Sequence, residues 1–125
     1  KFDQPKNELK VIKEALKVID KDNREIILIT HYQFISTFLD KPLNILNRWY
    51  LWDNNTHPTE NHKYFEVYKS LVDKNIKKNK IKVVYLLGQK NEINFSNVKN
   101  YFTDTCFKSK TIIPNRFSMH EIIKC

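Results

Sequence analysis

The sequence predicts an α/β fold: a three-layer α/β/α sandwich with a mostly parallel sheet, of the Rossmann-like or flavodoxin-like kind. Two short, unbroken apolar runs indicate this class, because a strand covered by helices on both faces must be apolar on both. They are residues 26–29 and 83–87. Segments with apolar residues at helical spacing alternate with these runs, which is typical of a parallel sheet. The end of the chain departs from this pattern and predicts an antiparallel hairpin at one edge of the sheet.

Along the first half of the chain, the first helix is the clearest element. Pro5 suits the opening turn of a helix, and apolar residues then recur at helical spacing as far as Ile19. The predicted elements of this half are a helix over 6–20, a strand over 25–30, a short helix over 34–39, a short strand over 47–52 and a loop over 53–60.

The second half contains the other long helix and the other buried strand. The inward stripe of this helix is expected to contain Tyr64, Phe65, Tyr68, Leu71, Val72 and Ile76. The predicted elements are a helix over 61–79, a strand over 81–87, a short helix over 96–103, and strands near 106–112 and 117–124 joined around Pro114-Asn115.

Length and charge limit the classes of function. A chain of 125 residues is long enough for one hydrophobic core but not for two, so a single domain over residues 1–125 is expected. The net charge is +8, yet only three of the 22 basic residues are arginine. Specific contacts to bases and phosphates lean on arginine, so the composition favours a solvated basic surface over a nucleic-acid interface. No stretch approaches the roughly 18 apolar residues of a transmembrane helix.

Polar residues follow the first buried strand, at the edge of the sheet where doubly wound folds bind ligands. Thr30, His31, Tyr32 and Gln33 are therefore candidate ligand contacts, and His31 is also a candidate general base. Gly88, the only glycine, ends the second buried strand and is a further candidate. The alternative is that a buried strand must become polar where it reaches solvent.

His57 is the other histidine considered for a catalytic role. His57 and His62 bracket the loop around Pro58, and Asp53 is nearby in sequence. None of these residues falls in a metal-binding motif, so no metal is predicted. No cofactor is expected either, because one glycine cannot build a phosphate-binding loop. The alternative for His57 is an ordinary histidine that is hydrogen-bonded at the end of a loop.

Trp49 and Trp52 belong to the densest aromatic cluster in the sequence, Trp49-Tyr50-Leu51-Trp52. Aromatic side chains with polar tips stack on sugars or bases and also lie at membrane interfaces. They equally form an ordinary core beneath a long loop. Since neighbouring residues of a strand face opposite sides, Trp49 and Trp52 are expected to point in opposite directions, with one of them in the core.

Cys106 and Cys125 are candidates for a disulfide. If the hairpin turns on Asn115-Arg116, the two cysteines are directly opposite each other, and they could bond in an oxidising compartment. A turn centred on Pro114-Asn115 would move the register by a residue and abolish this pairing.

Four segments carry a resemblance to a known family. In this order and spacing, they resemble the soluble C-terminal domain of bacterial polytopic membrane proteins that are similar to dolichyl-phosphate-mannose protein mannosyltransferases, a type of glycosyltransferase. The four segments are Ile27–Phe34, Asn47–Tyr50, Lys63–Lys69 and Ile81–Tyr85.

The resemblance implies a setting, without implying any catalytic residue. The family's catalytic acidic residues and lipid-phosphate contacts lie in its membrane portion, which this chain lacks. The domain would follow the last transmembrane helix and lie on the extracytoplasmic, periplasmic side of a bacterial membrane. Its partners would be the rest of its own membrane-embedded chain and a carbohydrate or glycolipid acceptor. The absence of a methionine before Lys1 agrees with a piece of a longer protein.

Three functions therefore follow from the sequence. The favoured one is a non-catalytic accessory domain of a glycosyltransferase-like membrane protein, which binds substrate or stabilises the assembly. The second is a small stand-alone enzyme that uses the end of the strand at 25–30 together with His57. The third is a basic nucleic-acid-binding module that uses the lysines and the aromatic cluster at 49–52.

Overall fold

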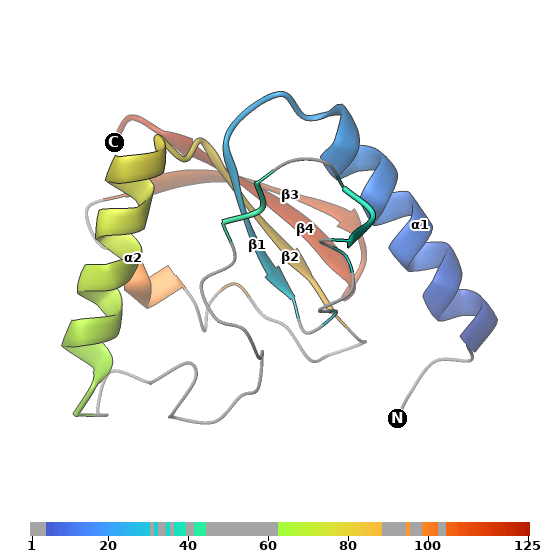
Figure 1. Cartoon of the computed structure of the whole chain (residues 1–125), viewed down its shortest axis with the longest axis horizontal. Coiled ribbons are helices and arrows are strands. Elements are labelled where there is room, and N and C mark those ends of the chain that lie inside the picture. Colours follow the sequence, from blue (N-terminus) through green and yellow to red (C-terminus); the bar gives the residue numbers. More distant parts are fainter. Residues whose placement is uncertain are drawn as a thin grey trace.

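The protein is described by a computed structural model over residues 5–30, 32, 35, 37–39, 42–44, 63–88, 95, 99–102 and 105–125. In this part of the chain, two α-helices flank a four-stranded sheet with the strand order β1-β2-β4-β3 (Figure 1). The elements are α1 (Pro5–Lys21), β1 (Ile26–Thr30), α2 (Phe65–Asn79), β2 (Val83–Leu87), a 3-10 helix (Lys99–Tyr101), β3 (Cys106–Ile113) and β4 (Phe117–Ile123).

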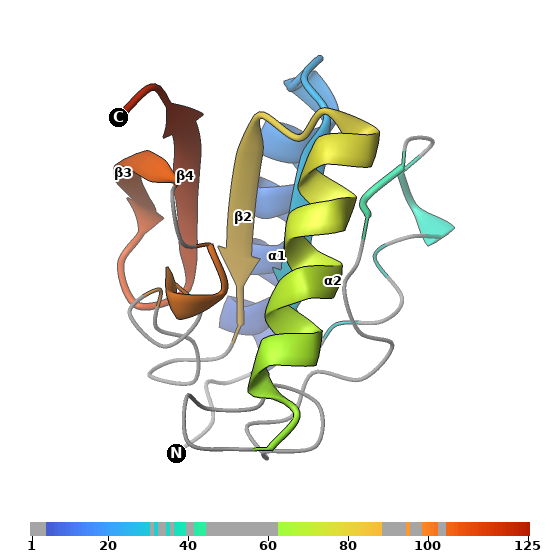
Figure 2. The same cartoon turned by 90° about the vertical axis from the view of Figure 1, so that its left-hand side faces the viewer.

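β1 and β2 form the buried centre of the sheet. They pair in parallel, from Ile26 opposite Val83 to Thr30 opposite Leu87, and every residue of both strands is buried. α1 and α2 lie on opposite faces of this pair (Figure 2). The predicted neighbourhood of these two strands is confirmed, and burial of both faces explains their unbroken apolar runs. The core on the α1 side contains Ile12, Ala15, Ile19, Ile26, Leu28 and Tyr85, and the core on the α2 side contains Phe65, Val72, Ile27, Ile29 and Val84.

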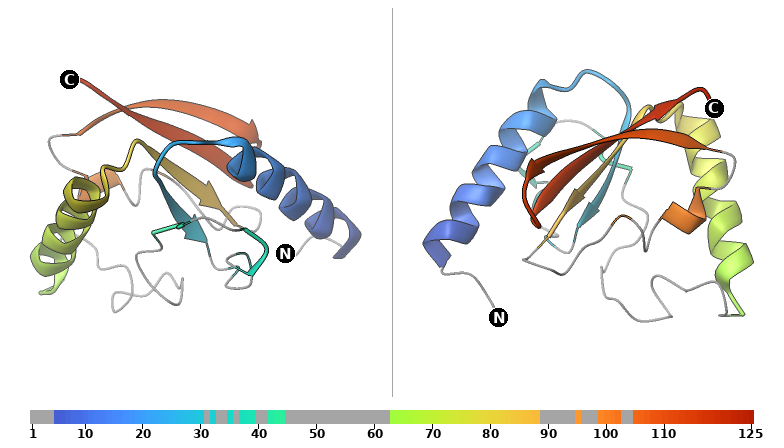
Figure 3. Two further views of the ribbon diagram at one scale, coloured as in Figure 1. Left: turned by 45° about the horizontal axis from the view of Figure 1, so that its top comes forward. Right: turned by 180° about the vertical axis from the view of Figure 1, so that it is seen from behind.

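The predicted three-layer sandwich with a mostly parallel sheet is wrong. Of the three strand pairings described, β1–β2 is parallel, whereas β2–β4 and β3–β4 are antiparallel. α2 lies in the long crossover between β1 and β2, which a parallel pair requires. β3 and β4 are joined by a tight turn, which makes them antiparallel, and β4 then pairs with β2. Seen from behind, this hairpin is the nearer part of the sheet and lies between the two helices (Figure 3, right).

The predicted hairpin of the last two strands is confirmed, but its turn is the alternative one. The backbone N–H of Arg116 donates to the carbonyl of Ile113 at 3.0 Å, and Asn115 has a φ of 60°. Pro114 in the second position and a left-handed residue in the third are typical of a type II turn. β3 also has a register shift between Thr111 and Ile113, because a type II turn does not match the twist of paired strands.

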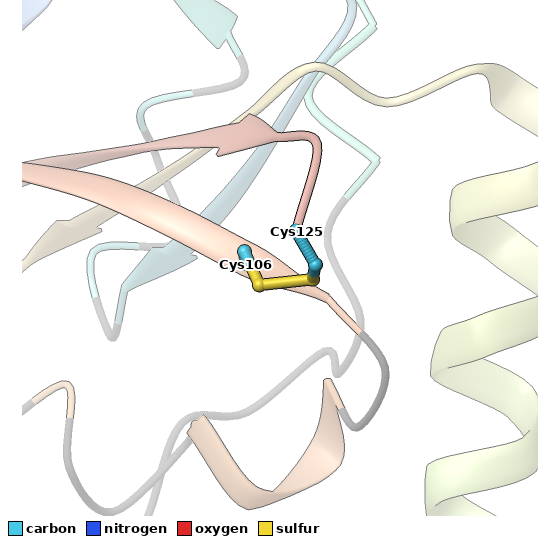
Figure 4. Close-up of a disulfide and its surroundings, with 2 residues drawn as sticks. All are labelled: Cys106 and Cys125. Atoms are coloured by element: carbon cyan, nitrogen blue, oxygen red, sulfur yellow. A yellow bond between two sulfur atoms is a disulfide. The ribbon is translucent and has the colours of Figure 1, made fainter.

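Cys106 and Cys125 form a disulfide with their Cα atoms 5.1 Å apart (Figure 4). The predicted bond is confirmed, whereas the requirement that the cysteines be directly opposite is wrong, since Cys106 pairs with Ile123. A residue two positions beyond the paired one faces the same side of a sheet. Because β4 ends at Ile123, the chain leaves the strand there and turns Cys125 towards β3.

The amino ends of β1 and β2 are fastened by Asp22 and Arg24. The Asp22 carboxylate accepts hydrogen bonds from the Arg24 guanidinium at 2.9 and 2.8 Å and from the Tyr85 hydroxyl at 2.6 Å. Arg24 also pairs with Glu121 of β4 at 3.2 Å. Burial opposes ionisation of Asp22, but the hydrogen bonds from Arg24 and Tyr85 outweigh it and lower the pKa of Asp22 to about 2. The turn between α1 and β1 is thereby fixed to β2 and β4.

The outer edge of β1 is covered by a short segment of chain. The backbone N–H of Leu28 donates to the carbonyl of Leu43 at 3.0 Å, and the Asn44 side chain donates to the carbonyl of Ile26 at 2.8 Å. Covering an edge strand in this way prevents it from pairing with another chain. The predicted strand over 47–52 and the loop over 53–60 lie outside the described residues. Within the described ranges, no helix combines the length and the apolar character needed to cross a membrane.

Candidate functional site

Three of the candidate ligand-binding residues lie together at the carboxyl ends of β1 and β2. Thr30 ends β1, Gly88 follows β2, and the backbone N–H of Tyr32 donates to the Thr30 hydroxyl at 3.1 Å. All three are buried. The other candidates lie outside the described residues, so the predictions made for them stay predictions: His31, Gln33, Trp49, Trp52 and His57.

Two residues that the sequence analysis did not identify complete this site. Arg116 follows the hairpin turn, and its Nε donates to the carbonyl of Gly88 at 2.8 Å, while its Nη2 donates to the Tyr32 hydroxyl at 3.4 Å. The Tyr32 hydroxyl in turn donates to a carboxylate oxygen of Glu8, on α1, at 2.5 Å. We call Glu8, Thr30, Tyr32, Gly88 and Arg116 the carboxyl-edge cluster.

The carboxyl-edge cluster contains a buried positive charge with a nearby negative one. Arg116 is only 7% exposed, and a buried charge is costly unless it is paired and hydrogen-bonded. Tyr32 accepts a hydrogen bond from Arg116 and donates one to Glu8, so it connects the two opposite charges. The cluster therefore joins α1, the end of β1, the end of β2 and the start of β4 through one chain of hydrogen bonds.

The chemistry of the carboxyl-edge cluster suits binding and positioning rather than proton transfer. Burial and the hydrogen bond to Glu8 raise the pKa of Tyr32 above its ordinary value. Its hydroxyl consequently stays protonated at neutral pH, where it can donate a hydrogen bond but cannot serve as a base. The parts of the chain that the structure describes contain no group of three or more His, Cys, Asp or Glu residues able to hold a metal ion.

His120 on β4 is a second buried polar residue that the sequence analysis did not identify. Its Nδ1 lies 2.7 Å from the Ser109 hydroxyl and its Nε2 lies 2.8 Å from the Ser118 hydroxyl. The imidazole also stacks on the ring of Phe95, with 3.7 Å between ring centroids.

A serine beside a histidine raises the question of nucleophilic catalysis. Burial lowers the pKa of His120 to about 4, so the ring is uncharged at neutral pH. A general base is most effective when its pKa lies near the working pH, and His120 is therefore a weak one. We interpret it as a structural residue whose two ring nitrogens are satisfied by Ser109 and Ser118.

Comparisons with protein-family models, with curated proteins and with solved structures found no match for this chain.

Replacing Arg116 with methionine should lower the free energy of unfolding by about 2 kcal/mol, since it leaves the Gly88 carbonyl and the Tyr32–Glu8 pair without their buried cation. Urea denaturation measures this loss. Lys110→Met is the matched control, because Lys110 is exposed on β3 and its loss should cost less than about 0.5 kcal/mol. Equal stability of the two variants would show that the buried guanidinium does not hold the sheet edge.

Proposed function

We propose that this chain is a non-catalytic accessory domain of a glycosyltransferase-like membrane protein and that it works on the extracytoplasmic side of the membrane. There it binds a carbohydrate or glycolipid, or stabilises the rest of its own membrane-embedded chain. The proposal starts from the resemblance of the four segments described above. The structural observation that carries it is the disulfide between Cys106 and Cys125.

The disulfide supports a location outside the cytoplasm. Disulfides persist in oxidising compartments such as the bacterial periplasm and are rare in the cytosol, where thiols are kept reduced. Both cysteines of the chain are used in this one bond, so no free cysteine remains. The bond joins the start of β3 to the chain just after β4. It thus fastens the open end of the hairpin.

The carboxyl-edge cluster supports a binding or structural role over a catalytic one. Its phenol accepts a hydrogen bond from the guanidinium and donates one to the carboxylate, and the phenol stays protonated at neutral pH. Such an arrangement holds a sheet edge in a fixed shape, which is what an accessory domain requires in order to present a binding surface. The stand-alone enzyme depends on His31 and His57, which lie outside the described residues, so that alternative stays a prediction.

The coding sequence upstream of Lys1 tests the proposal most simply. The expected result is a series of hydrophobic spans in the same reading frame, and a start codon directly before Lys1 would contradict it. In the longer protein, deletion of residues 1–125 should leave sugar transfer measurable at saturating acceptor, with a raised KM for the acceptor or a less stable membrane portion. Loss of kcat in a membrane portion that still folds and binds its donor would show that the domain is catalytic.

A further inference from the structure

Five lysines occupy one face of α1: Lys6, Lys10, Lys13, Lys17 and Lys21. All five are exposed, and we call them the lysine face. They are spaced three or four residues apart, so at 3.6 residues per turn they fall within a band about 80° wide and about 22 Å long.

The lysine face points away from the rest of the protein. Ile12, Ala15 and Ile19 lie on the other side of α1 and are buried against the sheet. Figure 1 shows α1 at the outside of the fold, far from α2. Two acidic residues of α1, Glu14 and Asp20, are exposed at the borders of the lysine face. Because like charges in one band repel each other, a surface of opposite charge would stabilise this arrangement.

The chemistry of the lysine face fits lipid headgroups. Clusters of four to eight basic residues on an amphipathic helix are typical of contacts with anionic lipids. Leu9 lies beside the lysines and is 53% exposed, so it offers an apolar contact at the headgroup boundary. Lysines act as point charges and suit a fluid anionic surface, whereas α1 contains no arginine fork for reading bases or single phosphates.

We infer that the lysine face of α1 docks on the surface of an anionic phospholipid bilayer and orients the domain against the membrane. The choice of a bilayer over nucleic acid rests on the proposed function, which puts the domain beside a membrane in an oxidising compartment. Glu8 of the carboxyl-edge cluster lies on the opposite side of α1 from the lysine face, so docking through the lysines leaves that cluster on another side of the helix.

Sedimentation with vesicles tests this inference on the full 125-residue chain. The disulfide-bonded protein should bind vesicles of phosphatidylglycerol mixed with phosphatidylcholine, and should not bind vesicles of phosphatidylcholine alone. Replacing Lys13 and Lys17 with glutamine should weaken binding about 30-fold, because each lysine near an anionic surface contributes about five- to sixfold. Binding should also weaken steeply as salt is raised, because exposed charges are screened.

The matched control is Lys74→Gln with Lys78→Gln, which removes the same charge at the same spacing from exposed positions on α2. This variant should bind within about threefold of the unmodified protein, since the sites face away from the docked surface. Equal losses in the two variants would mean that net charge alone drives binding, and the inference would fall. It would also fall if the protein did not bind anionic vesicles. The same holds if it bound an oligonucleotide more tightly than vesicles and this binding depended on Lys13 and Lys17.

Urea denaturation of each variant checks that the fold is intact, and glutamine is chosen because it preserves helix propensity. The outcomes also separate the two proposals. Failure to bind vesicles, with membrane spans encoded upstream of Lys1, would remove this inference and leave the proposed function standing. If the protein binds vesicles, the Lys13 and Lys17 variant does not, and a start codon lies directly before Lys1, the docking surface would be supported and the proposed function contradicted.

Discussion

Replacing Cys106 and Cys125 with serine is expected to lower the free energy of unfolding by about 3 kcal/mol. The disulfide joins residues that are 19 positions apart. Closing a loop of this length removes conformational freedom from the unfolded chain, which the chain-entropy description converts to about 3 kcal/mol. For a domain whose total stability is about 5–15 kcal/mol, this is a large share. The effect should appear in urea denaturation at pH 7 as a lower midpoint.

The control for this experiment is the reductant. Adding it should shift the midpoint of the unmodified protein down to that of the double-serine variant, and should leave the variant itself unchanged. If the oxidised and reduced forms of the unmodified protein unfold at the same urea concentration, then the bond between Cys106 and Cys125 contributes nothing to the fold. In that case the hairpin is held by β2–β4 pairing and the two cores alone.

Acidification should destabilise the domain through His120 by about 3 kcal/mol between pH 7 and pH 4. Burial lowers the pKa of His120 in the folded state to about 4, from an ordinary value of 6.5. Between these two values the unfolded chain binds a proton at this position and the folded chain does not. The contribution is therefore fully present above pH 6.5 and is lost as the pH falls towards 4, and the gap between the two pKa values corresponds to about 3 kcal/mol.

His120→Gln is the variant that isolates this effect. Glutamine can still donate to one neighbouring hydroxyl and accept from the other, but it does not titrate. The difference in unfolding free energy between the unmodified protein and the variant should change by about 3 kcal/mol from pH 7 to pH 4. Subtracting the variant removes the contributions of the other histidines. Asp22 acts in a separate window, because its stabilisation is lost only as the pH falls from its ordinary 3.8 towards 2. A difference that stays constant from pH 7 to pH 4 would show that His120 is not held uncharged.

The buried centre of the sheet could be predicted from the sequence because its signal is local. Residues 26–29 and 83–87 are apolar without interruption, and both proved to be strands buried on both faces. The order of the strands could not be predicted in the same way. Half-exposed β3 and the tight turn at Pro114-Asn115 favour antiparallel pairing, but nothing local shows that β4 pairs with β2. The mostly parallel prediction extended the pattern of one crossover to the whole sheet.

The buried face of α2 is narrower than the sequence predicts. The predicted inward stripe included Tyr64 and Leu71, but these residues are 53% and 60% exposed. The predicted residues that do contact the core are Phe65, Tyr68, Val72 and Ile76. They follow a narrower line along the helix, since α2 packs on a single sheet face.

The candidate site was predicted only in part, because some of its residues are far apart in the sequence. Thr30, Tyr32 and Gly88 could be identified because the ends of parallel strands meet at one edge. Glu8 and Arg116 lie 24 and 84 residues from Tyr32, and no local pattern links them to it. The sequence around His120, in contrast, contains a pattern that could have identified it.

The signal of His120 is the alternation of β4. Ser118 and His120 lie opposite Leu86 and Val84 of the buried β2. Residues paired across a sheet share a face, so these two polar side chains lie on a buried face and need hydrogen-bond partners. In the structure, His120 is hydrogen-bonded to Ser118 and also to Ser109. Alternation could therefore have identified a buried polar pair once the pairing of β4 with β2 was known.

The redox state of Cys106 and Cys125 in the cells that make this protein tests the account most directly. Free thiols are blocked with an alkylating agent before lysis, and the peptides are then analysed by mass spectrometry without reduction. The structure and the proposed location together predict that both cysteines escape alkylation and are recovered in one disulfide-linked pair of peptides. Recovery of both residues in alkylated form would place the protein in a reducing compartment and contradict the proposed function.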